Sequence, residues 1–215
     1  MEEHIPQGVI ERLPFYLNVL IQMRQDGQST ASSARLGELT GVNPAQIRRD
    51  LTHFGSFGRR GVGYEVVGLI DRIQRILGSD QTNRLVLVGA GNLGSAIASH
   101  DGLRKHGFVV SAVFDADRRK IGSRLGDIIV RDAAELERVV AEQGIRIGVI
   151  AVPPDASQHV ADRLAAAGIR VILNYTPAIV RVPAGVMLHN IDPAQELLHA
   201  LYYLSRPGIV APRGV

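Results

Sequence analysis

The sequence contains no cysteine and very little lysine, and both absences restrict its chemistry. Without cysteine the chain can form no disulfide, offer no thiolate nucleophile and ligate no zinc-finger metal. We therefore expect no metal site, and any redox response must pass through a bound cofactor. Lys105 and Lys120 are the only lysines, and the net charge of +3 is modest. The positions of the arginines therefore say more than the total charge.

Long apolar runs and a basic leader are also missing from the sequence. No stretch reaches the roughly 18 consecutive apolar residues that a membrane-spanning helix needs. The first residues, MEEHIPQGVIERL, are acidic and are interrupted by a proline, unlike a secretory leader. We therefore expect a soluble cytoplasmic protein without a membrane partner. Its 215 residues, 46% of them hydrophobic, suffice for two small domains or one large one.

The hydrophobic pattern changes after a polar, turn-rich stretch at residues 78–83. Before it, apolar residues recur at helical spacing, whereas after it short apolar runs alternate with helical patterns. The second pattern is typical of a parallel α/β sheet. We predict a winged helix-turn-helix domain at 1–78 and a doubly wound, parallel-sheet Rossmann domain at 79–192. A C-terminal dimerisation helix and tail would follow at 193–215.

The predicted C-terminal helix has an apolar stripe that must be buried. Leu197, Leu201 and Leu204 share one of its faces, at the spacing of an amphipathic helix. Either the chain's own Rossmann domain or a second subunit can cover this stripe. The sequence leaves both possibilities open.

A glycine-rich motif, GAGNLG, matches the G-x-G-x-x-G pattern of dinucleotide-binding sites. It directly follows the apolar run RLVLV and directly precedes a helical pattern, as the mechanism requires. Its glycines allow a tight turn, a close approach to the pyrophosphate and close packing of helix on strand. The pyrophosphate would then meet unpaired N–H groups at the helix N-terminus. A turn with no ligand is the alternative. The predicted cofactor contacts here are Gly89, Ala90, Gly91, Asn92, Leu93 and Gly94.

Further candidate cofactor residues follow the later strands. Asp115 ends the second strand pattern, 21 positions after Gly94, where a carboxylate accepts hydrogen bonds from the adenine ribose. Its charge would repel a 2′-phosphate and so favour NAD(H) over NADP(H), although neighbouring basic residues weaken this repulsion. Val152 and Pro153 follow the fourth strand, and Asn174 follows the fifth. They would line the ligand at the carboxyl edge of the sheet, unless the proline only ends its strand.

Residues 35–54 have the spacing of a helix-turn-helix. A turn separates two helical patterns, and Asn43 and Pro44 suit the cap and first turn of the second helix. Between residues 44 and 64, four arginines accompany one acid, Asp50, and the glycine-bracketed GSFGRRGVGY suits a basic β-wing. A packing hairpin with a solvated charged face is the alternative. The predicted DNA contacts are Gln46, Arg48, Arg49, Arg59 and Arg60.

Five stretches together resemble the Rex family of redox-sensing transcriptional repressors along almost the whole chain. They are IRRDLTHFGSFGRRGVGY, VLVGAGNLGSAIASH, FDADRRKIG, ILNYTP and IDPAQELLHAL. The resemblance implies a homodimer with exchanged C-terminal helices, whose winged helices read an inverted-repeat operator in double-stranded DNA. It also implies that NADH releases the DNA and that NAD+ competes for the same site.

The resemblance assigns roles to further residues. Lys120 would help to hold the adenosine half of the cofactor. Arg12 and Asp192 would form a pair that exchanges partners between the DNA-bound and NADH-bound states, and Asp192 would lie at the nicotinamide. Two positions depart from the family pattern. His100 replaces a tyrosine, which would make this switch pH-sensitive, and Pro193 replaces a bulkier apolar residue.

An NAD-dependent dehydrogenase is the main alternative for the same glycine motif. Against it, about 120 residues after GAGNLG complete one Rossmann sheet and leave no substrate domain. The histidines are also scattered, without a base-orienting partner nearby. A helix-turn-helix regulator that binds another nucleotide is a second alternative, because Asp115 indicates a ribose but not a nicotinamide. We predict a repressor that senses the NADH/NAD+ balance and is not an enzyme, with no catalytic residues.

Overall fold

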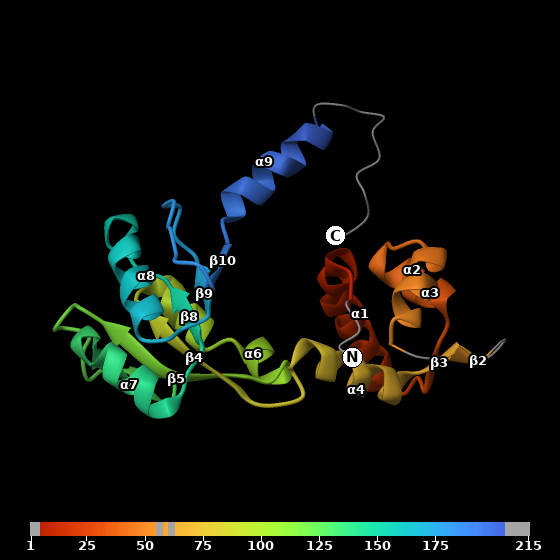
Figure 1. Cartoon of the computed structure of the whole chain (residues 1–215), viewed down its shortest axis with the longest axis horizontal. Coiled ribbons are helices and arrows are strands. Elements are labelled where there is room, and N and C mark those ends of the chain that lie inside the picture. The colour runs from red at the N-terminus through yellow and green to blue at the C-terminus, as the bar shows by residue number, and fades with distance from the viewer. Residues whose placement is uncertain (1–4, 55–57, 60–62, 205–215) are drawn as a thin grey trace. The chain divides into compact units, whose positions relative to one another are not determined.

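The computed structural model describes residues 5–54, 58–59 and 63–204. The chain divides between Gln81 and Thr82 into two compact units, shown in Figure 1. The polar, turn-rich stretch at residues 78–83 contains this division. No helix within the described residues is long and apolar enough to cross a membrane.

The first unit combines helices with a small sheet. The sheet has the order β1-β3-β2, and both pairings are antiparallel. Two successive helices followed by a β-hairpin are the arrangement of a winged helix-turn-helix, which confirms the predicted fold of this part. The elements are α1 (Gln7–Gln25), β1 (Thr30–Ala31), α2 (Ser33–Thr40), α3 (Pro44–Thr52), β2 (Gly58–Arg59), β3 (Gly63–Glu65) and α4 (Val66–Leu77).

Local chemistry fixes the ends of the two helices in the helix-turn-helix. Helix α2 ends at Gly41, whose φ of 76° is a conformation that favours glycine. The side chain of Asn43 accepts a hydrogen bond from the Ala45 amide at 2.8 Å, and Pro44 occupies the first turn of α3. These contacts satisfy an otherwise unpaired amide and preset the helical φ. The predicted cap and turn are therefore present.

A single apolar core joins the helices of the first unit. Each helix contributes one buried face, and Ile47, Leu51 and Phe54 anchor the region of α3. The opposite face of α3 is exposed at Arg48 and Arg49. Burying large aliphatic side chains stabilises this unit by about 1.5–3 kcal/mol each, and it orients α3 with its basic face outward. Other large side chains that are fully buried in this core are Leu13, Tyr16, Leu20, Leu36, Leu69, Ile70 and Ile73.

The second unit is built on a seven-stranded sheet with the order β10-β9-β8-β4-β5-β7-β6. All neighbours are parallel except β6 and β7. Chain order reverses at β4, which has β5 on one side and β8 on the other, as in a Rossmann fold. This confirms the predicted doubly wound sheet. The strands are β4 (Asn83–Val88), β5 (Phe108–Asp115), β6 (Arg124–Leu125), β7 (Ile128–Asp132), β8 (Ile147–Ile150), β9 (Val171–Asn174) and β10 (Met187–Asn190).

Helices cover both faces of this sheet. Successive residues of β4 point to opposite faces: Val86 and Val88 pack in the cluster that contains α7 and α8, whereas Leu85 and Leu87 pack in the cluster that contains α5. A strand buried on both faces needs a continuous apolar run, which explains the sequence RLVLV. The helices are α5 (Asn92–Ala98), α6 (Asp101–Lys105), α7 (Leu136–Gln143) and α8 (Ser157–Ala166).

The last helix, α9 (Pro193–Leu204), follows β10 and projects away from the sheet (Figure 1). Its predicted apolar stripe is exposed within the chain, with Leu197 68%, Leu201 54% and Leu204 77% accessible. The chain's own Rossmann domain therefore does not cover it.

Candidate nucleotide site and nucleic-acid interface

A cavity of about 810 Å³ opens beside the carboxyl ends of the parallel strands, at the point where the strand order reverses. Rossmann folds bind their ligands at this point, and the volume lies in the usual range for small-molecule sites. Most of the predicted cofactor residues line it. They are Gly89, Gly91, Asn92, Leu93, Asp115, Lys120, Val152 and Pro153.

The three glycines of the GAGNLG motif meet two kinds of steric demand. Gly89 has a φ of +107°, and a Cβ there would collide with the Ala151 carbonyl oxygen. A Cβ at Gly94 would collide with the carbonyl oxygen of Gly89. Gly91 is different, since a Cβ there would have no protein atom within 4 Å. Two glycines are thus needed for packing, and the third keeps the backbone accessible from the cavity.

Asp115 is anchored at the rim of this cavity. One carboxylate oxygen accepts from the Ala90 amide at 2.8 Å and from the Lys120 ammonium at 3.0 Å, and the other accepts from the Asp117 amide at 2.8 Å. Burial by itself raises the pKa of Asp115, but these hydrogen bonds outweigh burial and lower it. The group therefore carries a negative charge at neutral pH.

Several lining residues were not predicted. Asp155 precedes α8, while His159 and Arg163 lie on α8 one turn apart. Arg163 forms a bidentate pair with Glu137 at 2.6 and 2.7 Å. The spacing of four residues on the helix after β8 is a signal that could have indicated His159 and Arg163. Their approach to the cavity depends on how α8 packs, which the sequence does not specify.

Four predicted cofactor residues do not line the cavity. Ala90 contributes its amide to Asp115, and Gly94 packs against Gly89. Asn174 is fully buried, and its amide nitrogen donates to the Asn190 side chain at 3.0 Å while its oxygen accepts from the Thr176 amide and hydroxyl. It therefore holds the loop after β9 in place. Asp192 lies at the start of α9 and accepts from the Ala194 amide at 2.9 Å.

The first unit presents a basic helix face. Arg48 and Arg49 are exposed on α3, and Arg48 donates to the Ser33 hydroxyl at 3.0 Å. Arg59 lies in strand β2 of the wing, and predicted Arg60 lies outside the described residues. Gln46 is half-buried in the first turn of α3. Exposed arginines on a helix-turn-helix suit contacts with DNA phosphates and base edges.

Two protein families match the two units. Residues 4–52 match the family described as "Putative DNA-binding protein N-terminus", and residues 80–178 match "CoA binding domain". Among the described residues, no group of three or more histidine, aspartate or glutamate side chains could hold a metal ion.

Curated relatives match almost the whole chain. The redox-sensing transcriptional repressor Rex of Rubrobacter xylanophilus is 48% identical over 96% of this chain and 95% of its own length. Rex of Chloroflexus aggregans is 47% identical over 94% of this chain and 95% of its own length. This chain belongs to the Rex family. It is therefore a member of a family of transcriptional repressors and not of a family of dehydrogenases.

Solved structures of a Rex-family repressor, RSP, have the same fold as this Rex-family chain. The complex of RSP with NAD+ and operator DNA gives a TM-score of 0.85 at 38% identity, covering 94% of this chain and 92% of that one. The complex of RSP with NADH gives a TM-score of 0.84 at 37% identity, covering 94% of this chain and 95% of that one. The similarity thus extends over both units.

The structure gives the predicted switch residue Arg12 a partner in its own unit. The Arg12 guanidinium contacts both oxygens of Asp50 on α3, at 2.7 and 2.9 Å. The Tyr16 hydroxyl donates to the same carboxylate at 2.6 Å, and the Gln46 amide does so at 2.7 Å. This Asp50 cluster, comprising Arg12, Tyr16, Gln46 and Asp50, was not predicted. The exchange of partners between Arg12 and Asp192 stays a prediction.

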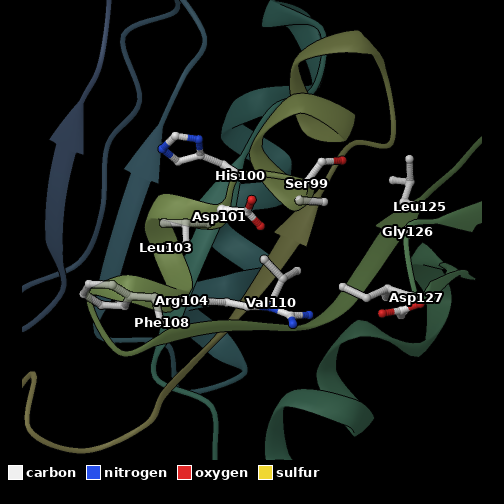
Figure 2. A pocket seen from close by; sticks show the side chains of 12 residues that line it. Ser99, His100, Asp101, Leu103, Arg104, Phe108, Val110, Leu125, Gly126 and Asp127 are labelled. Carbon is white, nitrogen blue, oxygen red and sulfur yellow. The ribbon is translucent and has the colours of Figure 1, made fainter.

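The third predicted switch residue, His100, lies apart from the nucleotide cavity. It is exposed in the turn between α5 and α6, at a separate pocket of about 290 Å³ shown in Figure 2. Residues from the end of α5, from α6, from β5 and from the β6–β7 hairpin line the rest of this pocket. The proposed effect of His100 on the switch stays a prediction in this Rex-family chain.

Proposed function

We propose that this chain is a cytoplasmic repressor that binds an inverted-repeat operator as a homodimer and releases it when NADH binds. The observation that carries the proposal is the presence of two sites on one chain, a basic winged helix and a Rossmann cavity. The related repressor RSP forms a complex with NAD+ and operator DNA, and another with NADH. By analogy, the nucleotide would bind in the Rossmann cavity and the operator at the basic winged helix.

The cavity supports an NAD(H) cofactor rather than NADP(H). Anchored Asp115 keeps one acceptor position, which would accept from the adenine ribose, and its negative charge would oppose a 2′-phosphate. The open backbone at Gly91 suits the pyrophosphate. Lys120 would hold the adenosine half by fixing Asp115. Val152, Pro153 and Tyr175 line the same cavity and would meet the nicotinamide half.

Redox sensing must come from the nicotinamide end of the cofactor. NADH and NAD+ share the adenosine and the pyrophosphate, so contacts with those parts bind both forms alike and shift no conformational equilibrium. The nicotinamide ring carries a positive charge only when oxidised. We propose that Asp192, with Arg12 and His100, couples this difference to the orientation of the two DNA-binding units.

A homodimer is supported by the exposed stripe of α9. Leu197, Leu198 and Leu201 are each more than half accessible, which isolated soluble chains rarely tolerate as a patch. A second subunit that exchanges this helix would bury the stripe. Two winged helices related by a twofold axis would then read two half-sites about one DNA turn apart. In this arrangement Arg48, Arg49 and the wing arginines Arg59 and Arg60 would contact DNA.

The deciding experiment is fluorescence anisotropy on an inverted-repeat DNA probe at fixed salt, because phosphate contacts depend on salt. NADH should release the probe, and excess NAD+ should restore binding. Arg49→Ala should weaken binding about tenfold, whereas Arg24→Ala, an exposed arginine on α1, should leave it unchanged. Binding that is indifferent to both redox forms would contradict the proposal, as would turnover of NADH with alcohols or hydroxy acids.

A further inference from the structure

The carboxylate of Asp50 is saturated with hydrogen bonds inside the first unit. Its side chain is 1% exposed, and each of its oxygens accepts two bonds. Arg12 donates to both oxygens, Tyr16 to one and Gln46 to the other. A carboxylate offers about four acceptor positions, so all of them are used. The two donors on α1 prevent Asp50 from turning, and its position relative to α3 is fixed.

This carboxylate determines which end of the Gln46 amide faces it. Burial alone raises the pKa of Asp50, but the bonds from Arg12, Tyr16 and Gln46 outweigh burial and lower it, so the group is ionised at neutral pH. An ionised carboxylate only accepts hydrogen bonds. Gln46 must therefore present Nε2 to Asp50, at 2.7 Å, and turn Oε1 away. The opposite orientation would place Oε1 against a negative charge.

The position of Gln46 on α3 makes this orientation relevant to DNA. Gln46 is the third residue of α3, and the N-terminal residues of a recognition helix reach base edges in the major groove. Beyond its bond to Asp50, the amide keeps Oε1 as an acceptor and one N–H as a donor. Adenine presents the complementary pair, the N6 amino donor and the N7 acceptor. Guanine presents two acceptors, O6 and N7, and would oppose Oε1.

We infer that Asp50 is a positioning residue that presets the Gln46 amide, and that Gln46 thereby reads an adenine in each operator half-site. The inference rests on the proposed function, since it requires operator binding. It assigns the identity of one operator base, which the basic residues of α3 do not do. Arg12 and Tyr16 act indirectly, because they hold Asp50 in place.

The test begins with duplexes selected from a random pool by the full-length wild-type chain. Each adenine of the selected half-site is then replaced singly by guanine, by purine, which lacks the N6 amino group, or by 7-deazaadenine, which lacks N7. Anisotropy compares wild type, Gln46→Met and Asp50→Asn. Gln46→Met keeps the bonds of Arg12 and Tyr16 to Asp50, so it preserves the fold. Gln22→Met, an exposed glutamine on α1, is the matched control.

At one adenine, wild type and Gln22→Met should lose about tenfold in affinity with each replacement, the size of a good bidentate contact. Gln46→Met should be indifferent at that adenine and unchanged elsewhere. Asp50→Asn, checked for folding by circular dichroism, should lose the same preference because its amide can face either end of Gln46. Retention of every preference by Gln46→Met, or loss at a base other than adenine, would overturn the inference. A wild-type chain that selects no sequence would instead overturn the proposed function.

Discussion

Asp50 and Asp115 are both anchored carboxylates, but they differ in what remains for a ligand. Among the described residues, Asp50 accepts four hydrogen bonds, all from side chains. Asp115 accepts three, two of them from backbone amides. Its side chain is 11% exposed, against 1% for Asp50. One carboxylate is thus saturated by the chain, and the other keeps an acceptor position at the rim of a cavity.

The difference separates a structural polar cluster from a binding site. Both groups have lowered pKa values for the same reason, since hydrogen bonds to the charged form outweigh burial. A lowered pKa therefore does not distinguish the two roles. The two roles are distinguished by the acceptor capacity that each carboxylate has left and by the presence of an adjacent cavity. The glycines show the same contrast. Protein atoms occupy the space beside Gly94, whereas the space beside Gly91 holds no protein atom within 4 Å of the position that a Cβ would take.

The largest effect is expected from filling the packed glycine. In Gly94→Ala the new Cβ would collide with the Gly89 carbonyl oxygen, so β4 and α5 must separate. We expect the second unit to lose more than about 4 kcal/mol of unfolding free energy and the protein to lose NADH binding. Chemical denaturation followed by circular dichroism measures this. A stable Gly94→Ala variant would show that the close packing is dispensable.

Removing the saturated carboxylate should cost about 3 kcal/mol of stability in the first unit. Asp50→Ala leaves the Tyr16 hydroxyl buried without its acceptor and the partly buried Arg12 guanidinium unpaired. Urea denaturation of this variant should show early loss of the first unit, with NADH binding to the second unit retained. Asp26→Ala, at the exposed end of α1, is the control. Equal stability of the two variants would contradict the role given to the cluster.

Filling the open glycine should abolish binding without unfolding. Gly91→Ala introduces a Cβ that meets no protein atom within 4 Å but occupies the space of the pyrophosphate. We expect NADH affinity to fall about 100-fold, which is about 2.7 kcal/mol, with an unchanged melting temperature. Isothermal titration calorimetry and a thermal melt measure the two quantities. Unchanged NADH affinity would show that the pyrophosphate does not lie at this backbone.

Neutralising the carboxylate at the cavity rim should have a smaller effect. Asp115→Asn removes a charged acceptor, so NADH affinity should fall about tenfold, or about 1.4 kcal/mol. NADPH affinity should rise, because the repulsion of a 2′-phosphate is lost. Calorimetry with both nucleotides gives the ratio. If the NADH/NADPH preference does not move, Asp115 does not contact the ribose.

The smallest effect is expected from acid. A folded-state pKa below the unfolded value of about 3.9 gives Asp50 a stabilising contribution that is complete above that pH. The contribution is lost as the pH falls through the lower folded value. The melting temperature of Asp50→Asn should therefore fall less steeply than that of wild type below about pH 4. Parallel curves of melting temperature against pH for Asp50→Asn and wild type would exclude a contribution of Asp50 to the pH dependence of stability.

Much of the fold and part of the site could be predicted because their signals are local. Asn43 caps an amide two residues away, Pro44 presets the helical φ, and Gly94 packs against Gly89 of the same motif, so spacing alone identifies them. Asn174 shows the limit. It follows a strand at the expected edge, yet its side chain bonds to Thr176 and Asn190 and not into the cavity. Strand position fixes the edge of the sheet but not the direction of a side chain.

The sequence by itself determined the two fold types, the turn of the helix-turn-helix and the glycine motif, since periodicity and capping depend on neighbouring residues. Only the tertiary structure decided that Arg12 pairs with Asp50, 38 positions away. It also decided that Asp50 is saturated while Asp115 is not. These pairings depend on how α1 packs on α3 and how β4 lies beside β5. Packing brings distant side chains together, and no local pattern records it.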